Sequence, residues 1–416
     1  MLNTPNSTGC PFSSGHKPFE HIGTYQFFGR AREECPVFFS EEIGYWVITR
    51  HQDIVSILRD PKTFSADVAL QPVTPFPDEL VSFLKDHGFG PEKVHPDCDP
   101  PRHRRFRNIA TKYLNLNTYR TLEDDMRAMV REYIERMKGQ QVVDIVDALT
   151  YEFPARVILH LFCKADIDPR QLKAWGTNRL ILVWGKLTEE EKVAAGDELV
   201  AFWNYIGSIV EERLAEPRDD YPSFLLQQRN GDDSVLTLNE IRSMLYALLF
   251  AGHETTTNAA GNLIIELMRN RDQWDKLVAD PSLIAQAVEE GLRFASSVVA
   301  WRRRTNRPVE INGVAIPENA KLLICLGSAN HDETVFEHSE RFDIQREDVR
   351  KHVTFGQGEH FCIGGPLARI ELRIMLEELT AAFPHMRLVE GQDFDWTQTI
   401  SFRGPQKLLL ELEGNA

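Results

Sequence analysis

Paired cysteines are missing from this 416-residue sequence. Its six cysteines are widely spread and form no Cys-x-x-Cys pair: Cys10, Cys35, Cys98, Cys163, Cys325 and Cys362. This spacing excludes a zinc ribbon and argues against a disulfide scaffold. Free cysteines are typical of a reducing compartment, so we expect no disulfide framework and a cytoplasmic location.

Long apolar runs and an excess of basic charge are also missing. No apolar stretch approaches the ~18 residues that a membrane span needs. The first residues lack the basic start and apolar run of a signal peptide. The formal net charge of −15 argues against nucleic acid as the default partner, although it leaves room for a local basic patch. We therefore expect a soluble protein that contacts neither membrane nor nucleic acid.

What is present is an ordinary globular composition, 42% hydrophobic and 26% charged, without internal repeats or low-complexity linkers. The fold class that this pattern predicts is mainly α with a minor β part, in one domain over residues 1–416. Residues 65–101 are rich in proline, glycine and charge and are long for a connection, which favours a substrate lid. The other expected segments are an irregular stretch at 1–30, a hairpin at 36–50, a helix near Asp53, helices over 102–281 and 282–294, strands within 309–328, a helix ending near Phe383 and a strand within 401–412.

One predicted helix should cross the whole molecule. Thr237-Leu-Asn-Glu240 is a capping-box pattern, in which the first and fourth side chains bond each other's backbone N–H groups. The helical pattern continues to about Met268, a length of ~48 Å at 1.5 Å per residue. Its middle is apolar nearly all round, so we expect it to be buried.

The most informative segment is Phe355-Gly-Gln-Gly-Glu-His-Phe-Cys362-Ile-Gly-Gly-Pro. Its glycines allow a close approach to a flat group, and a helix from about Pro366 directs its positive end at the thiolate. A lone cysteine is more often a small buried hydrophobe, but the frame Phe-Gly-x-Gly-x-His-x-Cys-x-Gly favours a ligand. The segment resembles the haem-binding loop of the cytochromes P-450. That resemblance implies the cytochrome P-450 fold, haem b (iron protoporphyrin IX) as cofactor, Cys362 as its iron ligand, and Phe355 and Gly364 beside it.

An acid and an alcohol lie in the centre of the long helix, in Ala251-Gly-His-Glu254-Thr255-Thr. A threonine hydroxyl can bond the carbonyl four residues earlier and bend the helix, and an acid beside an alcohol can relay protons. Without further context, a glycine-bearing packing site explains the pattern equally well. The segment resembles the oxygen-activation motif of the cytochromes P-450, which implies catalytic roles for Thr255 and Glu254 and a place over the haem for Ala251. We expect His253 to be a packing or hydrogen-bonded residue.

Glu290-Gly-Leu-Arg293 places an acid and a guanidinium on one helix face. Such a pair is common by chance, but it lies about 70 residues before Cys362, as the Glu-x-x-Arg pair does in cytochromes P-450. In that family a second arginine completes a triad. Phe336-Glu-His-Ser-Glu-Arg341-Phe resembles the segment that supplies it, with Ser339 where proline is usual, so the resemblance implies Arg341.

Haem carries two propionates, which need cationic or hydrogen-bonding partners when buried. Asp99-Pro-Pro-Arg-His103-Arg-Arg-Phe-Arg107 is similar to the cytochrome P-450 segment that meets one propionate, and its histidine and arginine lie one helical turn apart. The resemblance places Arg303 at the other propionate, with Arg302 or Arg304 as substitutes. It adds His360 as a further partner.

The resemblance extends to substrate, oxygen and redox partners. The segments GYWV, SANHDE, HETT and SFRGP look most like bacterial members of the thiocarbamate-degrading type and like haem domains of self-sufficient, reductase-fused members. A basic face is implied as the docking site of a ferredoxin or flavodoxin and its reductase: Arg102, Arg104, Arg105, Arg369 and Arg373. The implied pocket residues, each equally explicable as core, are Val68, Ala69, Leu70, Trp184, Leu248, Ala251, Val298, Val299, Ile400 and Phe402. Because they are apolar, we expect a small to medium hydrophobic substrate, aromatic ones included.

The expected function is that of a monooxygenase that inserts one atom of O2 into such a substrate, by hydroxylation or by O- or N-dealkylation. Electrons would come from NAD(P)H through separate carriers, unless the chain is part of a reductase fusion. A peroxygenase that uses H2O2 is the first alternative, although it would not need the pair Glu254 and Thr255. A non-enzymatic haem sensor is the second, although it would normally carry an output domain.

Overall fold

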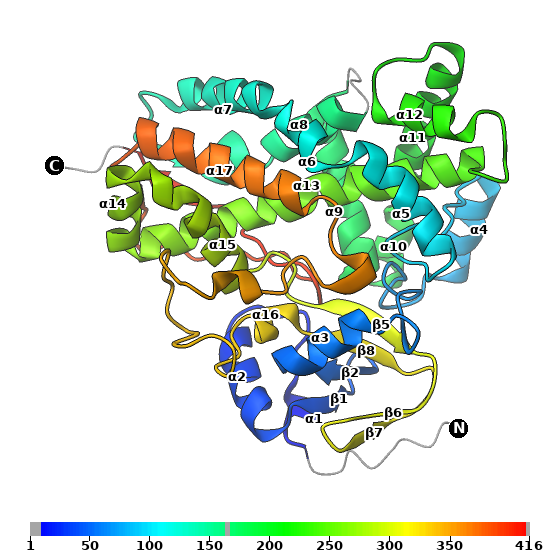
Figure 1. Cartoon of the computed structure of the whole chain (residues 1–416), viewed down its shortest axis with the longest axis horizontal. Coiled ribbons are helices and arrows are strands. Elements are labelled where there is room, and N and C mark those ends of the chain that lie inside the picture. Colours follow the sequence, from blue (N-terminus) through cyan, green and yellow to red (C-terminus); the bar gives the residue numbers. More distant parts are fainter. Residues whose placement is uncertain (1–9, 163–166, 413–416) are drawn as a thin grey trace.

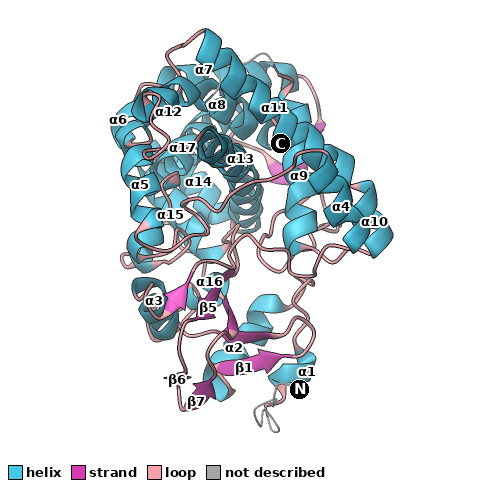
Figure 2. Ribbon diagram, turned by 90° about the vertical axis from the view of Figure 1, so that its right-hand side faces the viewer, coloured by secondary structure: helices cyan, strands magenta, loops and turns pink. Residues whose placement is uncertain are grey.

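The long central helix organises the structure. A computed structural model describes residues 10–162 and 167–412, so that Cys163 lies outside the described residues. Helix α13 (Leu238–Arg269) runs through the middle of the helical part, and most of the strands lie together at one end of the molecule (Figures 1 and 2). The mainly helical fold with small sheets is confirmed.

Helix α13 forms for the reasons that its sequence supplies. The Thr237 hydroxyl accepts from the Glu240 N–H at 3.0 Å, and the Glu240 carboxylate accepts from the Thr237 N–H at 3.0 Å. These bonds satisfy two of the donors that a helix start leaves open. The helix has 32 residues, and most of its side chains are buried. In its middle, however, Ala251 is exposed, which indicates a cavity beside the helix.

The helices besides α13 are α1 (Phe12–Gly15), α2 (Thr24–Glu34), α3 (His51–Arg59), α4 (Asp78–Asp86), α5 (Arg102–Tyr113), α6 (Leu116–Arg120), α7 (Glu123–Met137), α8 (Phe153–Phe162), α9 (Pro169–Trp184), α10 (Glu189–Ala194), α11 (Gly196–Ala215), α12 (Tyr221–Arg229), α14 (Arg271–Ala279), α15 (Ile284–Phe294), α16 (Leu326–Ala329) and α17 (Gly365–Ala382). Of these, α8, α9, α11, α12, α14, α15 and α17 contact α13, whereas α1, α2, α3 and α16 lie beside the strands (Figures 1 and 2). Among the residues that the structure describes, no helix is both long and apolar enough to cross a membrane.

The largest sheet has the order β1-β2-β8-β5-β3. The predicted hairpin is confirmed, since β1 (Val37–Ser40) pairs antiparallel with β2 (Tyr45–Ile48). Strand β8 (Lys321–Ile324) is parallel to β2, and β5 (Trp301–Thr305) is antiparallel to β8. The remaining strands are β3 (Phe64–Ser65), β4 (Val142–Asp144), β6 (Val309–Ile311), β7 (Val314–Ile316), β9 (Arg387–Leu388) and β10 (Leu409–Glu411). Strand β5 contains Arg303, one of the predicted propionate partners.

Two expectations about irregular segments are wrong in detail. Residues 1–30 contain α1 and most of α2 instead of irregular chain alone, and residues 65–101 contain α4. The expected C-terminal strand is confirmed over Leu409–Glu411, and the residues before it form bends and two isolated bridges. Short amphipathic helices such as α4 are hard to recognise in a stretch rich in proline and glycine, since burial of one face stabilises them.

The expectation of unpaired cysteines is wrong at one place. Cys10 and Cys35 form a disulfide, with Cα atoms 6.5 Å apart. Helix α1 packs on β1, and this contact brings Cys10 beside the end of α2. A separation of 25 residues carries no sequence signal of such a pair. Cys98, Cys325 and Cys362 are free.

Candidate active site

A cavity of about 260 Å³ lies between α13, the Cys362 loop, α17, α5 and β5. Cys362 and Phe355 line one side, and Ala251 and Thr255 of α13 line another. Arg107 and Arg303 from α5 and β5 also line the cavity, together with His360 and Gly364. The cavity therefore unites residues as far apart in the sequence as Leu58 and Phe402.

The Cys362 loop is shaped by glycines and by its own backbone. The Cys362 N–H donates to the Phe355 carbonyl at 2.9 Å. Gly358 has a φ of 70°, and a Cβ there would lie 2.7 Å from the Leu58 carbonyl oxygen, so no larger residue fits. Burial raises the pKa of the Cys362 thiol, while the N–H groups of Gly364 and Gly365 oppose the shift by stabilising a thiolate. A cation bound at the sulfur would favour the thiolate form of Cys362.

The alcohol and the acid of α13 face different directions. The Thr255 hydroxyl donates to the Ala251 carbonyl at 3.1 Å, as expected, and Thr255 lines the cavity. Glu254 is buried and contacts α9, where Lys173 Nζ lies 2.7 Å from Oε2 and the Thr177 hydroxyl 2.9 Å from Oε1. Burial favours the neutral acid, but Lys173 and His253 outweigh it and lower the pKa of Glu254 to about 2. Glu254 is thus an ionised group behind α13, one residue from a hydroxyl in the cavity.

His253 is a packing residue. Its Nδ1 lies 2.5 Å from the Leu249 carbonyl, and its ring is fully buried outside the cavity lining. A Cβ at Gly176 would lie 2.3 Å from His253 Nε2, so this glycine makes room for the ring. Burial lowers the pKa of His253.

Donors without partners surround the base of the cavity. The rings of His103 and His360 lie 4.1 Å apart, and both ring nitrogens of His103 and Nε2 of His360 are buried without a hydrogen-bond partner in the described part of the chain. His360, Arg107 and Arg303 line the cavity, while His103 lies directly behind His360. Burial lowers the pKa of Arg303 to about 10. Buried donors of this kind need acceptors, so the set fits the two carboxylates of haem b next to a thiolate ligand.

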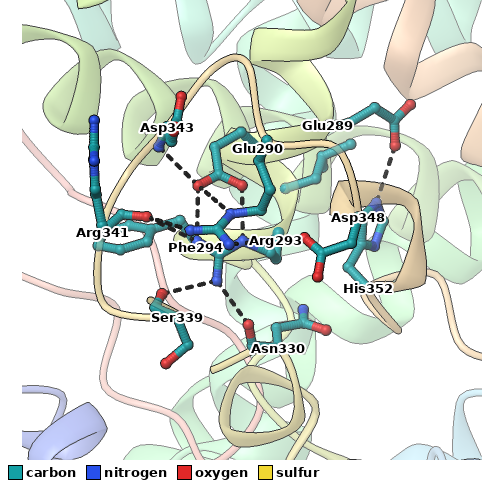
Figure 3. A network of polar contacts seen from close by, with 12 residues as sticks. Glu289, Glu290, Arg293, Phe294, Asn330, Ser339, Arg341, Asp343, Asp348 and His352 are labelled. Carbon is teal, nitrogen blue, oxygen red and sulfur yellow. Dashed lines mark hydrogen bonds and ion pairs between the residues drawn. The ribbon is translucent and has the colours of Figure 1, made fainter. Parts of the chain in front are cut away.

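The Glu-x-x-Arg pair is fully buried and densely bonded (Figure 3). Glu290 Oε2 and Oε1 each lie 2.7 Å from a nitrogen of Arg293, which also donates to the carbonyls of Asn330 and Ser339. The pair therefore links α15 to the segment around Asn330 and Ser339, which precedes the Cys362 loop.

The assignment of Arg341 as the third member of this group is wrong. The second arginine at the carboxylate is Arg346, whose Nε lies 3.3 Å from Glu290 Oε1. Arg341 is exposed, and its side chain extends away in Figure 3. Only its carbonyl contributes, because it accepts from Arg293 and Arg346. The spacing pattern could not separate a side-chain contact from a main-chain one.

The predicted pocket residues divide into three groups. Those that line the cavity are Leu70, Leu248, Ala251, Val298 and Phe402. Those buried in the core instead are Val68, Ala69 and Trp184, while Val299 and Ile400 line a separate cavity beside the N-terminal segment. Val298 and Val299 separate because successive residues of an extended chain point to opposite faces.

The arginines of the expected docking face are all engaged within the chain. Arg102 and Arg105 pair with Glu240, and Arg102 also with Glu92. The other pairs are Arg104 with Glu359, Arg369 with Glu289, and Arg373 with Glu123 and Glu377. The face is therefore less positive than the arginines alone suggested. Partly exposed pairs of this kind are weak, so a partner could exchange them.

Several residues at the site were missed by the sequence analysis. His95 and Arg179 line the cavity, as does Glu371 of α17, which is buried and whose Oε2 has no hydrogen-bond partner in the described residues. Burial raises the pKa of Glu371 well above its ordinary value. The sequence does offer an indication for Arg179, because a charged residue directly precedes the apolar run Leu-Ile-Leu-Val-Trp184 on a buried helix.

This combination of fold, cysteine loop and bonded helix motif defines a haem-thiolate enzyme. The sequence model of the family "Cytochrome P450" matches residues 180–393, more than half of the chain, and the chain belongs to this family. It is accordingly a monooxygenase with haem b as cofactor, and it inserts oxygen at a thiolate-ligated haem.

Particular relatives agree with this assignment. "Cytochrome P450 107B1" of Saccharopolyspora erythraea is 34% identical over 368 residues, which cover 87% of this chain and 88% of the relative. The solved structure of cytochrome P450 CREJ in complex with (4-ethylphenyl) dihydrogen phosphate is 37% identical with a TM-score of 0.93, covering 96% of this chain and 99% of that one. An intact type IV self-sufficient cytochrome P450 monooxygenase is 36% identical with a TM-score of 0.93, covering 97% of this chain and 53% of that one.

Proposed function

We propose that this monooxygenase hydroxylates a small to medium hydrophobic substrate, aromatic ones included, or dealkylates its ethers or amines. Electrons would reach it from NAD(P)H through a separate ferredoxin or flavodoxin system. The observation that carries the proposal is that Cys362 and Thr255 line one cavity whose other walls are mainly apolar. We take residues 1–416 as one haem-binding domain.

Each protein group has a distinct role in this proposal. Haem b supplies the chemistry of O2 reduction and cleavage when it is bound. Cys362 would hold the iron, and the N–H groups of Gly364 and Gly365 would stabilise the sulfur's negative charge. His103, Arg107, Arg303 and His360 would hold the propionates. The buried ring nitrogens of His103 and His360 without partners in the described residues, and the place of Arg107 and Arg303 in the cavity lining, support this role.

Thr255 would hold a proton donor, such as a water molecule, at the oxygen-binding side. Its hydroxyl donates to the Ala251 carbonyl, which leaves its oxygen lone pairs free to accept from a water molecule in the cavity. Glu254 would supply protons from behind α13, through rotation away from Lys173. Because Glu254 is ionised at neutral pH, it would act as a carrier that is protonated only transiently.

The apolar walls support an uncharged ring or chain as the reacting part of the substrate. Leu70, Leu248, Val298 and Phe402 form these walls. The related CREJ structure holds (4-ethylphenyl) dihydrogen phosphate, an alkyl-substituted aromatic ring, which is a molecule of the same shape class. A flat ring of this size suits a pocket of apolar side chains.

The difference spectrum of the reduced protein with CO tests the thiolate assignment directly. We expect the red-shifted band that thiolate ligation produces, and its loss in Cys362→Ala. Cys98→Ala is the matched control, because Cys98 is free and buried outside the cavity lining, and it should keep the band. An imidazole-type band in the wild-type protein would contradict the role of Cys362.

A further inference from the structure

A buried arginine borders the substrate side of the cavity. Arg179 of α9 is 6% exposed and lines the cavity. Its Nη1 donates to the Tyr246 carbonyl at 2.8 Å, and its Cζ lies 3.9 Å from the centre of the Tyr246 ring and 4.9 Å from that of Phe250. The guanidinium is thus held in one orientation by a carbonyl and two rings, which pre-organises its remaining donors.

Arg179 has no carboxylate partner among the residues that the structure describes. Among residues 10–162 and 167–412, no carboxylate forms an ion pair with Arg179, and its Nε and Nη2 donate to no described residue. The nearest acidic influence is Asp97, whose Oδ1 already accepts from the Val94 N–H at 2.9 Å. Burial raises the pKa of Asp97 to about 6, and its carboxylate forms no ion pair with Arg179.

Two other buried arginines have carboxylate partners, since Arg293 pairs with Glu290 and Arg213 pairs with Asp220 at 2.6 Å. Buried Arg302 instead donates to the carbonyls of Ala69 and Gln71. A guanidinium remains charged in proteins, and a buried charge without a partner is costly. An anion that entered the cavity would remove this cost at Arg179, which is a specific driving force for binding.

Of the arginines that line the cavity, Arg179 is the one that the two haem propionates would not engage. The three arginines of the lining are Arg107, Arg179 and Arg303. Under the proposed function, the two haem propionates engage Arg107 and Arg303. Burial lowers the pKa of His95 and raises that of Glu371, so burial favours the neutral form of both groups.

We propose that Arg179 binds the anionic head group of the substrate, so that the substrates of this enzyme are small apolar molecules that carry one carboxylate or phosphate monoester. The proposal rests on the proposed function and specifies its substrate class. The head group would bond Nε and Nη2 in the forked geometry that carboxylates and phosphates share. The apolar body would lie against Leu248 and Phe402, toward Thr255.

Spectral titration of the haem-loaded protein tests this assignment. The ligands are 4-ethylbenzoate, 4-ethylphenyl phosphate and the neutral 4-ethylbenzamide, which share one ring and one alkyl tail. We expect at least one anion to bind about 10- to 100-fold more tightly than the amide, the range that one charged, hydrogen-bonded contact produces. The anion that binds more tightly identifies the head group as carboxylate or phosphate.

Variants assign the preference to the residue. Arg179→Gln should abolish the preference for the anion and leave the affinity for the amide within about twofold, whereas Arg179→Lys should keep part of the preference. Arg302→Gln is the matched control, because Arg302 is buried, stacks on Trp184 and binds the carbonyls of Ala69 and Gln71, but does not line the cavity. It should keep the preference.

The outcomes separate this inference from the proposed function. Equal wild-type affinity for the anions and the amide overturns the role of Arg179, even when the CO spectrum is that of a thiolate ligand. A preference that survives in Arg179→Gln overturns it as well. If Arg179→Gln does not bind haem, the role of Arg179 is still tested by the wild-type affinities for the anions and the amide and by the Arg179→Lys variant. A non-thiolate CO spectrum contradicts the proposed function instead.

Discussion

The two sides of the cavity are built differently. The cysteine side consists of consecutive residues, Phe355 to Gly365, whose main-chain bonds and positive-φ glycines define its shape. The opposite side collects single residues from α9, α13, the segment before α5 and the C-terminal segment, such as Arg179, Thr255, His95 and Phe402. The first side is local in sequence and rigid, while the second is assembled by tertiary contacts. In the proposed function, iron ligation therefore belongs to the first side and substrate choice to the second.

The largest effect should follow from breaking the buried pair that supports the cysteine side. Glu290→Ala leaves Arg293 charged and buried without its partner, which costs about 3–5 kcal/mol in the free energy of unfolding. We expect little or no haem-loaded protein, measured by denaturant unfolding and by the ratio of haem to protein absorbance. Glu333→Ala, which removes a half-exposed partner of Arg32, should cost much less, and equal losses would contradict the difference in burial.

On the other side, Thr255→Ala should separate oxygen consumption from product formation. The variant should bind haem and substrate normally but release most reducing equivalents as hydrogen peroxide, because the hydroxyl no longer holds a proton donor. Peroxide and product measured against NAD(P)H consumed give the coupling. Thr255→Ser keeps the hydroxyl and should keep most of the coupling. Full coupling in the alanine variant would refute the proton role.

Glu254→Gln should have a smaller effect on turnover and a recognisable pH signature in stability. The pKa of Glu254 is lowered from 4.5 to about 2 in the folded protein, so its contribution to stability is present above about pH 4.5 and is lost as the pH falls toward 2. The difference in the free energy of unfolding between wild type and variant should shrink over that interval. A difference that stays constant with pH would mean that the carboxylate is not ionised in the folded protein.

Two alanine variants test whether Arg346, and not Arg341, is the second arginine side chain bonded to Glu290. Arg346→Ala removes a buried side chain bonded to Glu290 and to three carbonyls, and should cost about 1–3 kcal/mol in the free energy of unfolding. Arg341→Ala should cost less than about 0.5 kcal/mol, because its exposed side chain contributes no bond to the group. The reverse order, measured by urea unfolding, would restore the original assignment.

The smallest effect should appear at the proposed docking face. Arg104 is the most exposed of its arginines, with 64% of its side chain accessible, and it pairs with Glu359. Arg104→Gln should slow reduction by a ferredoxin or flavodoxin by a few-fold at low salt and hardly at all at high salt. Stopped-flow reduction measures this rate, and Arg136→Gln, on an exposed pair of α7, is the control. An unchanged rate at low salt would place the partner elsewhere.

Much of the site was predictable because its parts are short motifs. The Cys362 loop, the capped helix from Thr237 and the pair Glu290–Arg293 are each encoded within a few residues. The propionate partners were predicted from the resemblance to the cytochromes P-450, and two of them, His103 and Arg107, lie one helical turn apart. Other residues escaped prediction: Arg346 stands five positions after the expected arginine, and Arg179 and Glu371 are each one of several polar residues on their helices. Their partners come from other elements, which spacing cannot reveal.

The sequence by itself predicted the family, the proposed iron ligand and the helix that carries the alcohol, since glycine geometry, capping and ligand chemistry act over a few residues. Tertiary structure alone decided which side chains face the cavity. It turned Glu254 toward Lys173 and Thr255 toward the cavity, although they are neighbours, because adjacent residues of a helix point about 100° apart. It also paired the arginines of the docking face with carboxylates and left Arg179 without one. Charge compensation depends on distances in space, so only the folded chain could show it.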